Sequence, residues 1–156
     1  MKKFVLFDFD GVIADSLAVC LKTAQTLCPH ITEEQYRAAF TANIYETHKT
    51  LMPLTHGPEC HHDLDWFEVY IPLFENESKL FSGISEVIEG LAHKYTLIIV
   101  SSSVNSPIQG FLEKHHLGRY FSDIMGADPH TKKTEKIKIV FDRYAATADQ
   151  CVFVPD

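Results

Sequence analysis

Phe4-Val5-Leu6-Phe7-Asp8-Phe9-Asp10-Gly11-Val12 is the segment that decides the predicted fold of this chain. Its first four residues are apolar, with one β-branched and two aromatic side chains. Such a run is typical of a strand buried on both faces in a parallel sheet. Two carboxylates, Asp8 and Asp10, follow at a spacing of two. If the extended backbone continues through Asp10, both acids leave the strand on the same side.

Two like charges at the end of a strand repel each other unless a cation lies between them or one carboxylate takes a proton. The apolar run directs Asp8 and Asp10 to the carboxyl end of a strand, where open α/β sheets bind ligands. The alternative is a strand that simply ends in two solvated acids. We favour a functional site.

The composition limits the classes of function. The chain has 156 residues, close to one domain, and 46% of them are hydrophobic, enough for a core. The formal net charge of −7 argues against a nucleic-acid or anionic-membrane partner. No apolar run approaches the ~20 residues of a membrane helix, and the amino terminus enters a strand rather than a signal peptide. We therefore expect a cytoplasmic protein.

Strands and helices alternate along most of the chain. Helical spacing of apolar residues begins at Leu17, and Thr32 to Gln35 form a capping box. No strand pattern is found over 17–80, which predicts a small helical insert. The pattern predicts a doubly wound, mostly parallel α/β sheet, with a core of residues 1–16 and 81–156 and a cap of residues 17–80. The later strands are expected at 95–100, 123–126 and 151–154, and the later helices around 84–91, 108–112 and 137–144.

Polar residues follow several of these strands. Because the carboxyl ends of parallel strands share one edge of a sheet, residues far apart in sequence can meet there. Carboxylate oxygens suit Mg²⁺, and a hydroxyl and an ammonium suit the oxygens of a transferring phosphoryl group. The residues expected at this edge are Asp8, Asp10, Ser101, Lys133 and Asp156.

The run from Asp8 to Ser16 resembles the first motif of the haloacid dehalogenase superfamily, in its phosphatase and β-phosphoglucomutase-like branch. The apolar strand that closes on Ser101 resembles the second motif, and Ser101, Ser103 and Asn105 together resemble the phosphoglucomutase-like subgroup. Lys133 lies where related phosphatases keep the third-motif lysine. The insert resembles the helical cap of that family.

The resemblance implies a role for each matching residue. Asp8 would be the nucleophile and Asp10 the general acid and base. The remaining lysines near Lys133 stay open as alternatives for phosphate binding, namely Lys132 and Lys136. The resemblance implies that Mg²⁺ is held by Asp8, Asp10 and Asp156, and that the phosphate is bound by Ser101, Ser102, Asn105 and Lys133.

The expected activity is Mg²⁺-dependent hydrolysis of a small phosphorylated metabolite through an aspartyl phosphate. Pro155 stands where the fourth motif usually has glycine, and the sequence ends at Asp156, so we expect a core that is incomplete at its C-terminus and an activity that is weakened. The alternatives are a sugar phosphomutase of the same superfamily and an impaired module that binds phosphate esters. The substrate and the oligomeric state stay open.

The four cysteines form no C-x-x-C pair, and we expect all of them to be reduced thiols. A transition-metal cluster is a less favoured alternative, because its spacing fits no common zinc site. Its members would be His56, Cys60, His61, His62 and Asp63.

Overall fold

The computed structural model describes residues 1–39, 57–127 and 132–155. The chain divides into two compact units, one formed by Met1–Asp15 with Lys79–Asp156 and the other by Ser16–Ser78. We call them the α/β unit and the helical unit. The cap predicted at 17–80 concerns the same part of the chain as the helical unit.

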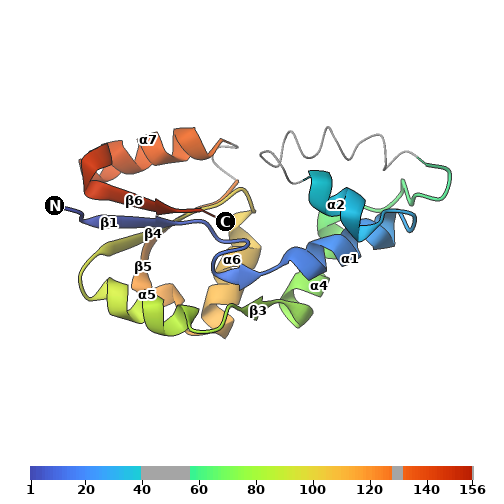
Figure 1. Ribbon diagram of the computed structural model, residues 1–156, viewed down its shortest axis with the longest axis horizontal. Helices are drawn as coiled ribbons and strands as arrows, with labels where there is room; N and C mark the ends of the chain where they lie inside the picture. The colour runs from blue at the N-terminus through green and yellow to red at the C-terminus, as the bar shows by residue number, and fades with distance from the viewer. Residues whose placement is uncertain (40–56, 128–131, 156) are drawn as a thin grey trace. The chain divides into compact units, whose positions relative to one another are not determined.

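The α/β unit contains a four-stranded parallel sheet (Figure 1). The strand order is β5-β4-β1-β6, so β1 is central and the order reverses beside it. In such sheets the ligand site lies at the carboxyl ends of the strands next to the reversal. The predicted α/β fold is confirmed. The strands are β1 (Phe4–Phe7), β4 (Thr96–Val100), β5 (Phe121–Met125) and β6 (Cys151–Val154).

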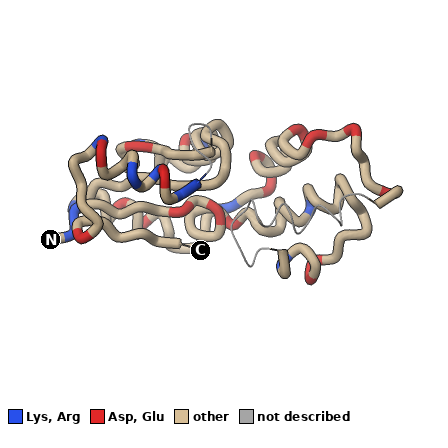
Figure 2. Tube along the Cα trace, turned by 90° about the horizontal axis from the view of Figure 1, so that it is seen from above, with Lys and Arg blue, Asp and Glu red and all other residues tan. Residues whose placement is uncertain are grey.

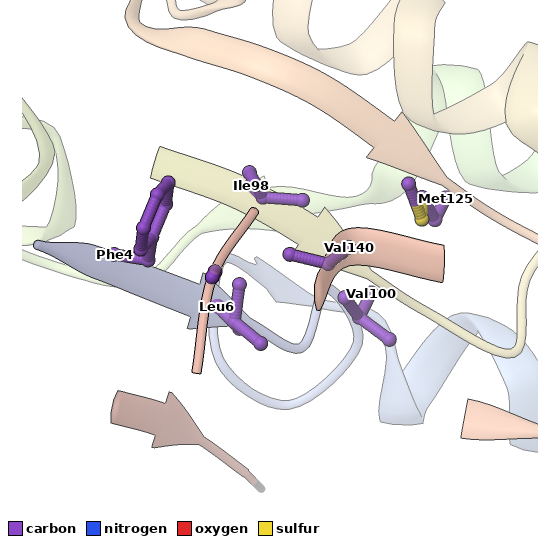
Figure 3. Close-up of a cluster of buried hydrophobic side chains, with 7 residues drawn as sticks. Phe4, Leu6, Ile98, Val100, Met125 and Val140 are labelled. Atoms are coloured by element: carbon purple, nitrogen blue, oxygen red, sulfur yellow. The ribbon is translucent and has the colours of Figure 1, made fainter. Parts of the chain in front are cut away.

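Helices cover both faces of the sheet. Figure 1 shows α7 (Lys133–Tyr144) on one side, and α5 (Ile84–Ala92) and α6 (Asn105–Lys114) on the other. All four residues of β1 are buried, as its apolar run predicts. A cluster of buried side chains joins the sheet to α7, and Figure 3 shows its members from β1, β4, β5 and α7. The cluster consists of Phe4, Leu6, Ile98, Val100, Met125, Val140 and Ala146.

Two short strands were missed by the sequence prediction. β2 (Ala14–Asp15) pairs antiparallel with β3 (Lys79–Leu80). Between β1 and β2 the chain turns at Gly11, whose φ of 76° suits glycine, and the amide of Gly11 donates to the carbonyl of Ala14 at 3.0 Å. Two-residue strands carry no periodicity that a sequence pattern could detect.

The helical unit contains α1 (Leu17–Leu27), α2 (Glu33–Ala39) and α4 (Trp66–Glu77) among its described residues. The predicted capping box before α2 is confirmed. The Thr32 amide donates to the Gln35 side chain at 2.9 Å, and the Gln35 amide donates to the Thr32 hydroxyl at 3.2 Å. Asp65 caps α4 by accepting from the amides of Phe67 and Glu68.

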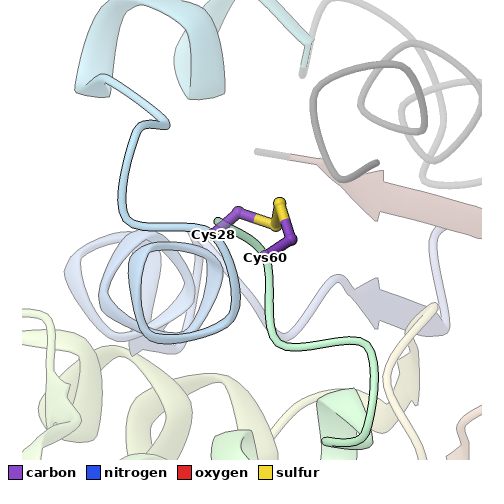
Figure 4. The surroundings of a disulfide bond; sticks show 2 residues. All are labelled: Cys28 and Cys60. Atoms are coloured by element: carbon purple, nitrogen blue, oxygen red, sulfur yellow. A yellow bond between two sulfur atoms is a disulfide. The ribbon is translucent and has the colours of Figure 1, made fainter. Parts of the chain in front are cut away.

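Cys28 and Cys60 form a disulfide, so the expectation of four reduced thiols was wrong for this pair (Figure 4). Cys28 caps the end of α1, and the amide of His61 donates to the carbonyl of Leu27 at 2.7 Å. That backbone bond brings the two Cα atoms to 4.3 Å, a contact that linear sequence does not reveal. Because its sulfur is bonded to Cys28, Cys60 is not a ligand of the less favoured metal cluster. His56, another predicted member of that cluster, lies outside the described residues. Cys20 and Cys151 take no part in a disulfide.

Charged residues of both signs are scattered along the trace of the α/β unit (Figure 2). In the part of the chain that the structure describes, no helix combines the length and the apolar character needed to cross a bilayer.

Candidate active site

Asp8 is the first residue beyond β1, and its side chain is buried, with 3% of the residue exposed. Parallel pairing with β6 continues to this point, because the Asp8 amide donates to the Val154 carbonyl at 2.9 Å. The Asp8 Oδ1 atom accepts from the Phe9 amide at 2.8 Å. The backbone therefore holds this carboxylate at the carboxyl end of the central strand.

Lys133 provides the positive charge beside this carboxylate. Its Nζ atom contacts Oδ2 of Asp8 in an ion pair, although 125 residues separate the two in sequence. Lys133 is the first residue of α7, and its side chain is 32% exposed. An ammonium so placed stabilises the ionised carboxylate and can also reach solvent or a ligand.

Asp10 lies two residues further on, in the turn after β1. It forms an isolated bridge with Ala14, and its Oδ2 atom accepts a hydrogen bond from the Ser103 hydroxyl. Ser103 follows β4, the strand that pairs with β1. The two acids predicted from the first motif are thus each held by a residue from a later part of the chain.

The segment from Ser101 to Asn105 links β4 to α6 and forms a tight loop at the same edge of the sheet. The Ser101 Oγ atom accepts from the Ser103 amide at 3.0 Å, and the Asn105 Oδ1 atom accepts from the Gly126 amide at 2.7 Å. The Ser103 carbonyl accepts from the Ala127 amide at 2.8 Å. These bonds join the loop after β4 to the end of β5.

The close approach of the loop after β4 to the end of β5 requires glycine at position 126. A Cβ atom built at Gly126 would lie 2.5 Å from the Ser103 carbonyl oxygen and would also overlap the Asn105 side chain. Any larger residue would have to displace the loop, so the close approach of the two segments depends on glycine.

Lys136 is fully buried, and its Nζ atom donates to the backbone carbonyl of Ser101. Lys133 and Lys136 are three residues apart in α7 and so project from similar sides of the helix. Lys132, the remaining alternative for phosphate binding, is exposed and precedes α7 as its N-cap.

The donor set fits a magnesium ion in its chemistry. The Asp8 carboxylate and the oxygens of Asp10 are hard ligands, which Mg²⁺ prefers together with water and phosphate oxygens. The third predicted ligand, Asp156, lies outside the described residues. Within residues 1–39, 57–127 and 132–155, no group of three or more His, Cys, Asp or Glu side chains is arranged to hold a metal.

The structure brings most of the predicted site residues to one edge of the sheet. Ser102 is partly exposed in the same loop and takes no part in the hydrogen bonds described above. Sequence reasoning did not single out Ser103 as a partner of Asp10, nor Gly126. Two patterns could have pointed to them: the S-x-S spacing after the strand, and a glycine directly after β5.

The chain is similar to known proteins over nearly its whole length. The family model described as haloacid dehalogenase-like hydrolase matches residues 5–156. The chain is 25% identical over an alignment of 171 residues to the phosphoglycolate phosphatase of Vibrio parahaemolyticus. That alignment covers 99% of this chain and 75% of the relative.

Solved structures show the same fold. A hydrolase of the haloacid dehalogenase-like family from Streptococcus pneumoniae superposes with a TM-score of 0.75 at 18% identity, covering 99% of this chain and 76% of that one. A magnesium-bound structure from Bacillus subtilis, named for the same superfamily of hydrolases, superposes with a TM-score of 0.73 at 21% identity. It is matched over 99% of this chain and 80% of its own.

Proposed function

The chain belongs to the haloacid dehalogenase-like hydrolases and is an enzyme of their phosphatase type. We propose that it hydrolyses phosphate monoesters of small metabolites with Asp8 as the nucleophile. The observation that carries the proposal is the buried carboxylate of Asp8 in contact with the Lys133 ammonium at the carboxyl end of the central strand. The match to the family model confirms the resemblance seen in the first motif.

In the first step, a carboxylate oxygen of Asp8 attacks the phosphorus atom of the ester. The bond between phosphorus and the ester oxygen breaks, and Asp10 donates a proton to the leaving alkoxide. The products are a free alcohol and a phosphoryl group on Asp8. Lys133 already contacts Asp8, so its ammonium is close enough to neutralise the charge that collects on the phosphoryl oxygens.

In the second step, Asp10 removes a proton from water as the water oxygen attacks phosphorus. The bond between the Asp8 oxygen and phosphorus breaks, inorganic phosphate leaves, and both acids regain their starting states. Asp8 and Asp10, with Asp156 as the third ligand expected from the sequence, would hold Mg²⁺, whose charge would offset the repulsion between the carboxylate and the anionic ester. The magnesium in the Bacillus subtilis structure supports this cofactor.

The name of the Vibrio relative suggests a short phosphorylated carboxylic acid, phosphoglycolate, as the first substrate to test. A panel of phosphorylated sugars should be assayed beside it, because Ser101, Ser103 and Asn105 resemble the phosphoglucomutase-like subgroup. A mutase would return the phosphoryl group to the substrate, giving an isomer without release of phosphate.

The test is the release of inorganic phosphate from p-nitrophenyl phosphate and from this panel. We expect turnover that requires Mg²⁺, stops with a chelator, and is lost in Asp8→Asn. Asp142→Asn is the matched control, because Asp142 is exposed on α7 and away from the site. Binding of a phosphate ester without turnover would favour the binding module instead.

A further inference from the structure

Lys136 is an unusual lysine, because none of its surface is exposed to solvent. Lysine is almost never fully buried unless its charge is compensated, since an ammonium removed from water loses its hydration. It also interrupts an apolar face of α7, four residues before the buried core residue Val140. We therefore expect the buried ammonium of Lys136 to form specific contacts that offset its loss of hydration.

One contact of Lys136 is with the backbone of the loop after β4. The Lys136 Nζ atom donates to the carbonyl of Ser101, a residue with 0% exposure. The amide of Ser101 donates to the Met125 carbonyl at 3.0 Å, so Ser101 is held both from α7 and from β5. A hydrogen bond from a charged donor is roughly twice as strong as a neutral one.

Ser101 is the first residue in a short series of hydrogen bonds that ends at Asp10. The Ser101 hydroxyl oxygen accepts from the amide of Ser103 at 3.0 Å, and the Ser103 hydroxyl donates to Asp10. A shift of the Ser101 peptide would therefore move the donor that orients Asp10. Lys133, three residues before Lys136, contacts Asp8 directly.

We infer that Lys136 is a positioning residue for the phosphoryl-transfer site: its buried ammonium holds the Ser101 peptide, and the loop so fixed sets the place of Ser103 and, through it, of Asp10. The inference rests on the proposed function for its catalytic consequence, while the ordering of the loop can be measured without turnover. Lys133 contacts the Asp8 carboxylate, and Lys136 contributes a hydrogen bond to the backbone of the loop.

The test compares Lys136→Met with Lys138→Met in the full chain. Methionine keeps an unbranched apolar side chain but removes the charge and the donor. Lys138 is two residues away on the same helix and exposed, where it pairs with Glu135, so it is the matched control. Three quantities are measured for each variant: amide hydrogen exchange, the midpoint of thermal unfolding, and kcat and KM on p-nitrophenyl phosphate.

We expect Lys136→Met to increase exchange at the amides of Ser103, Gly126 and Ala127, which bond within or onto the loop. We expect kcat to fall about tenfold to a hundredfold, the cost of a small misplacement of catalytic groups, with KM changed less than about threefold. The unfolding midpoint should fall, because the buried Ser101 carbonyl loses its donor, so kcat is measured well below the midpoint of the variant. Lys138→Met should match the wild type in all three.

Three results would overturn the inference. The first is unchanged exchange in the loop. The second is a loss of kcat no larger than the fraction of unfolded protein, which would make Lys136 merely structural. The third is a large rise in KM at constant kcat, which would mean that Lys136 binds the phosphate itself. If the wild-type chain hydrolyses none of the esters, the proposed function fails, and the exchange measurement alone decides whether Lys136 orders the loop.

Discussion

The hydroxyl of Ser103 donates a hydrogen bond to the Oδ2 atom of Asp10, across 93 residues of sequence. The bond connects the turn after β1 to the loop after β4, and it orients the carboxylate that we propose as general acid and base. The same loop is held by Lys136 and by the backbone after β5. The position of the proton-transferring group therefore depends on three parts of the chain.

Ser103→Ala should lower kcat about tenfold, which corresponds to roughly 1.4 kcal/mol of transition-state stabilisation, with KM nearly unchanged. The loss follows because the Asp10 side chain would no longer be held in one orientation. Steady-state kinetics on p-nitrophenyl phosphate measures the effect. Ser106→Ala is the control, since Ser106 is exposed in the first turn of α6. Equal kcat values in the wild type and Ser103→Ala would show that this hydrogen bond has no catalytic role.

Lys133→Met should reduce kcat/KM by about a hundredfold or more, because it removes the ammonium that contacts the Asp8 carboxylate. We expect KM to rise as well as kcat to fall, since the ammonium would bind phosphoryl oxygens in both the ground state and the transition state. The Lys138→Met variant again serves for comparison. A Lys133→Met enzyme with normal kinetics would exclude Lys133 as the phosphate-binding lysine.

Gly126→Ala should destabilise the α/β unit by about 1–3 kcal/mol, because the added Cβ overlaps the loop at Ser103 and Asn105. The free energy of unfolding, measured with urea, should fall, and phosphatase activity should fall with the displaced loop. Gly90→Ala is the matched control. Nothing lies within 4 Å of its added Cβ in α5, so it should stabilise the protein by about 0.5–1 kcal/mol. Equal effects of the two substitutions would contradict the packing at Gly126.

The free energy of unfolding should fall under mildly acidic conditions because of the imidazole of His115. Burial lowers the pKa of its imidazole below the ordinary value of 6.5, and the neighbouring charges of Lys114 and His116 lower that pKa further. Its Nε2 atom is buried with no hydrogen-bond partner among the described residues. The unfolded chain therefore binds a proton more readily than the folded one as the pH drops below 6.5.

Because the folded-state pKa of His115 is depressed, its contribution to stability is complete above pH 6.5 and is lost as the pH falls toward the folded-state pKa. The free energy of unfolding, measured by urea titration at pH 7.5 and 5.5, should decrease more in the wild type than in His115→Leu. His93→Leu, at an exposed position, should retain the wild-type decrease. An identical pH dependence in His115→Leu and wild type would remove His115 as the cause.

Reduction of the Cys28–Cys60 disulfide should destabilise the helical unit by about 2–4 kcal/mol, because the bond closes a segment with a sequence separation of 32. The unfolding midpoint should drop on adding a dithiol reductant, and Cys28→Ser with Cys60→Ser should reproduce the drop without reductant. Cys20→Ser, at a cysteine of the same unit that is not in the disulfide, should leave the response to reductant intact. A midpoint insensitive to reductant would argue against a bond that stabilises this unit.

Local sequence patterns predict the four strands of the parallel sheet, most of the helices and the location of the two acids. The apolar run before Asp8 predicts a buried central strand, and the box from Thr32 to Gln35 predicts the start of α2; both are found. The two-residue strands β2 and β3 escaped prediction, since their pairing is not periodic in sequence.

Which distant groups meet follows from the packing of the strands and helices. Lys133 and Lys136 are three residues apart in sequence, yet the first contacts the Asp8 carboxylate and the second donates to the Ser101 carbonyl. The packing also pairs Cys28 with Cys60 and gives Gly126 its role under the loop. Sequence patterns report the conformation of neighbouring residues, whereas these contacts depend on how strands and helices pack, which brings together atoms that are remote along the chain.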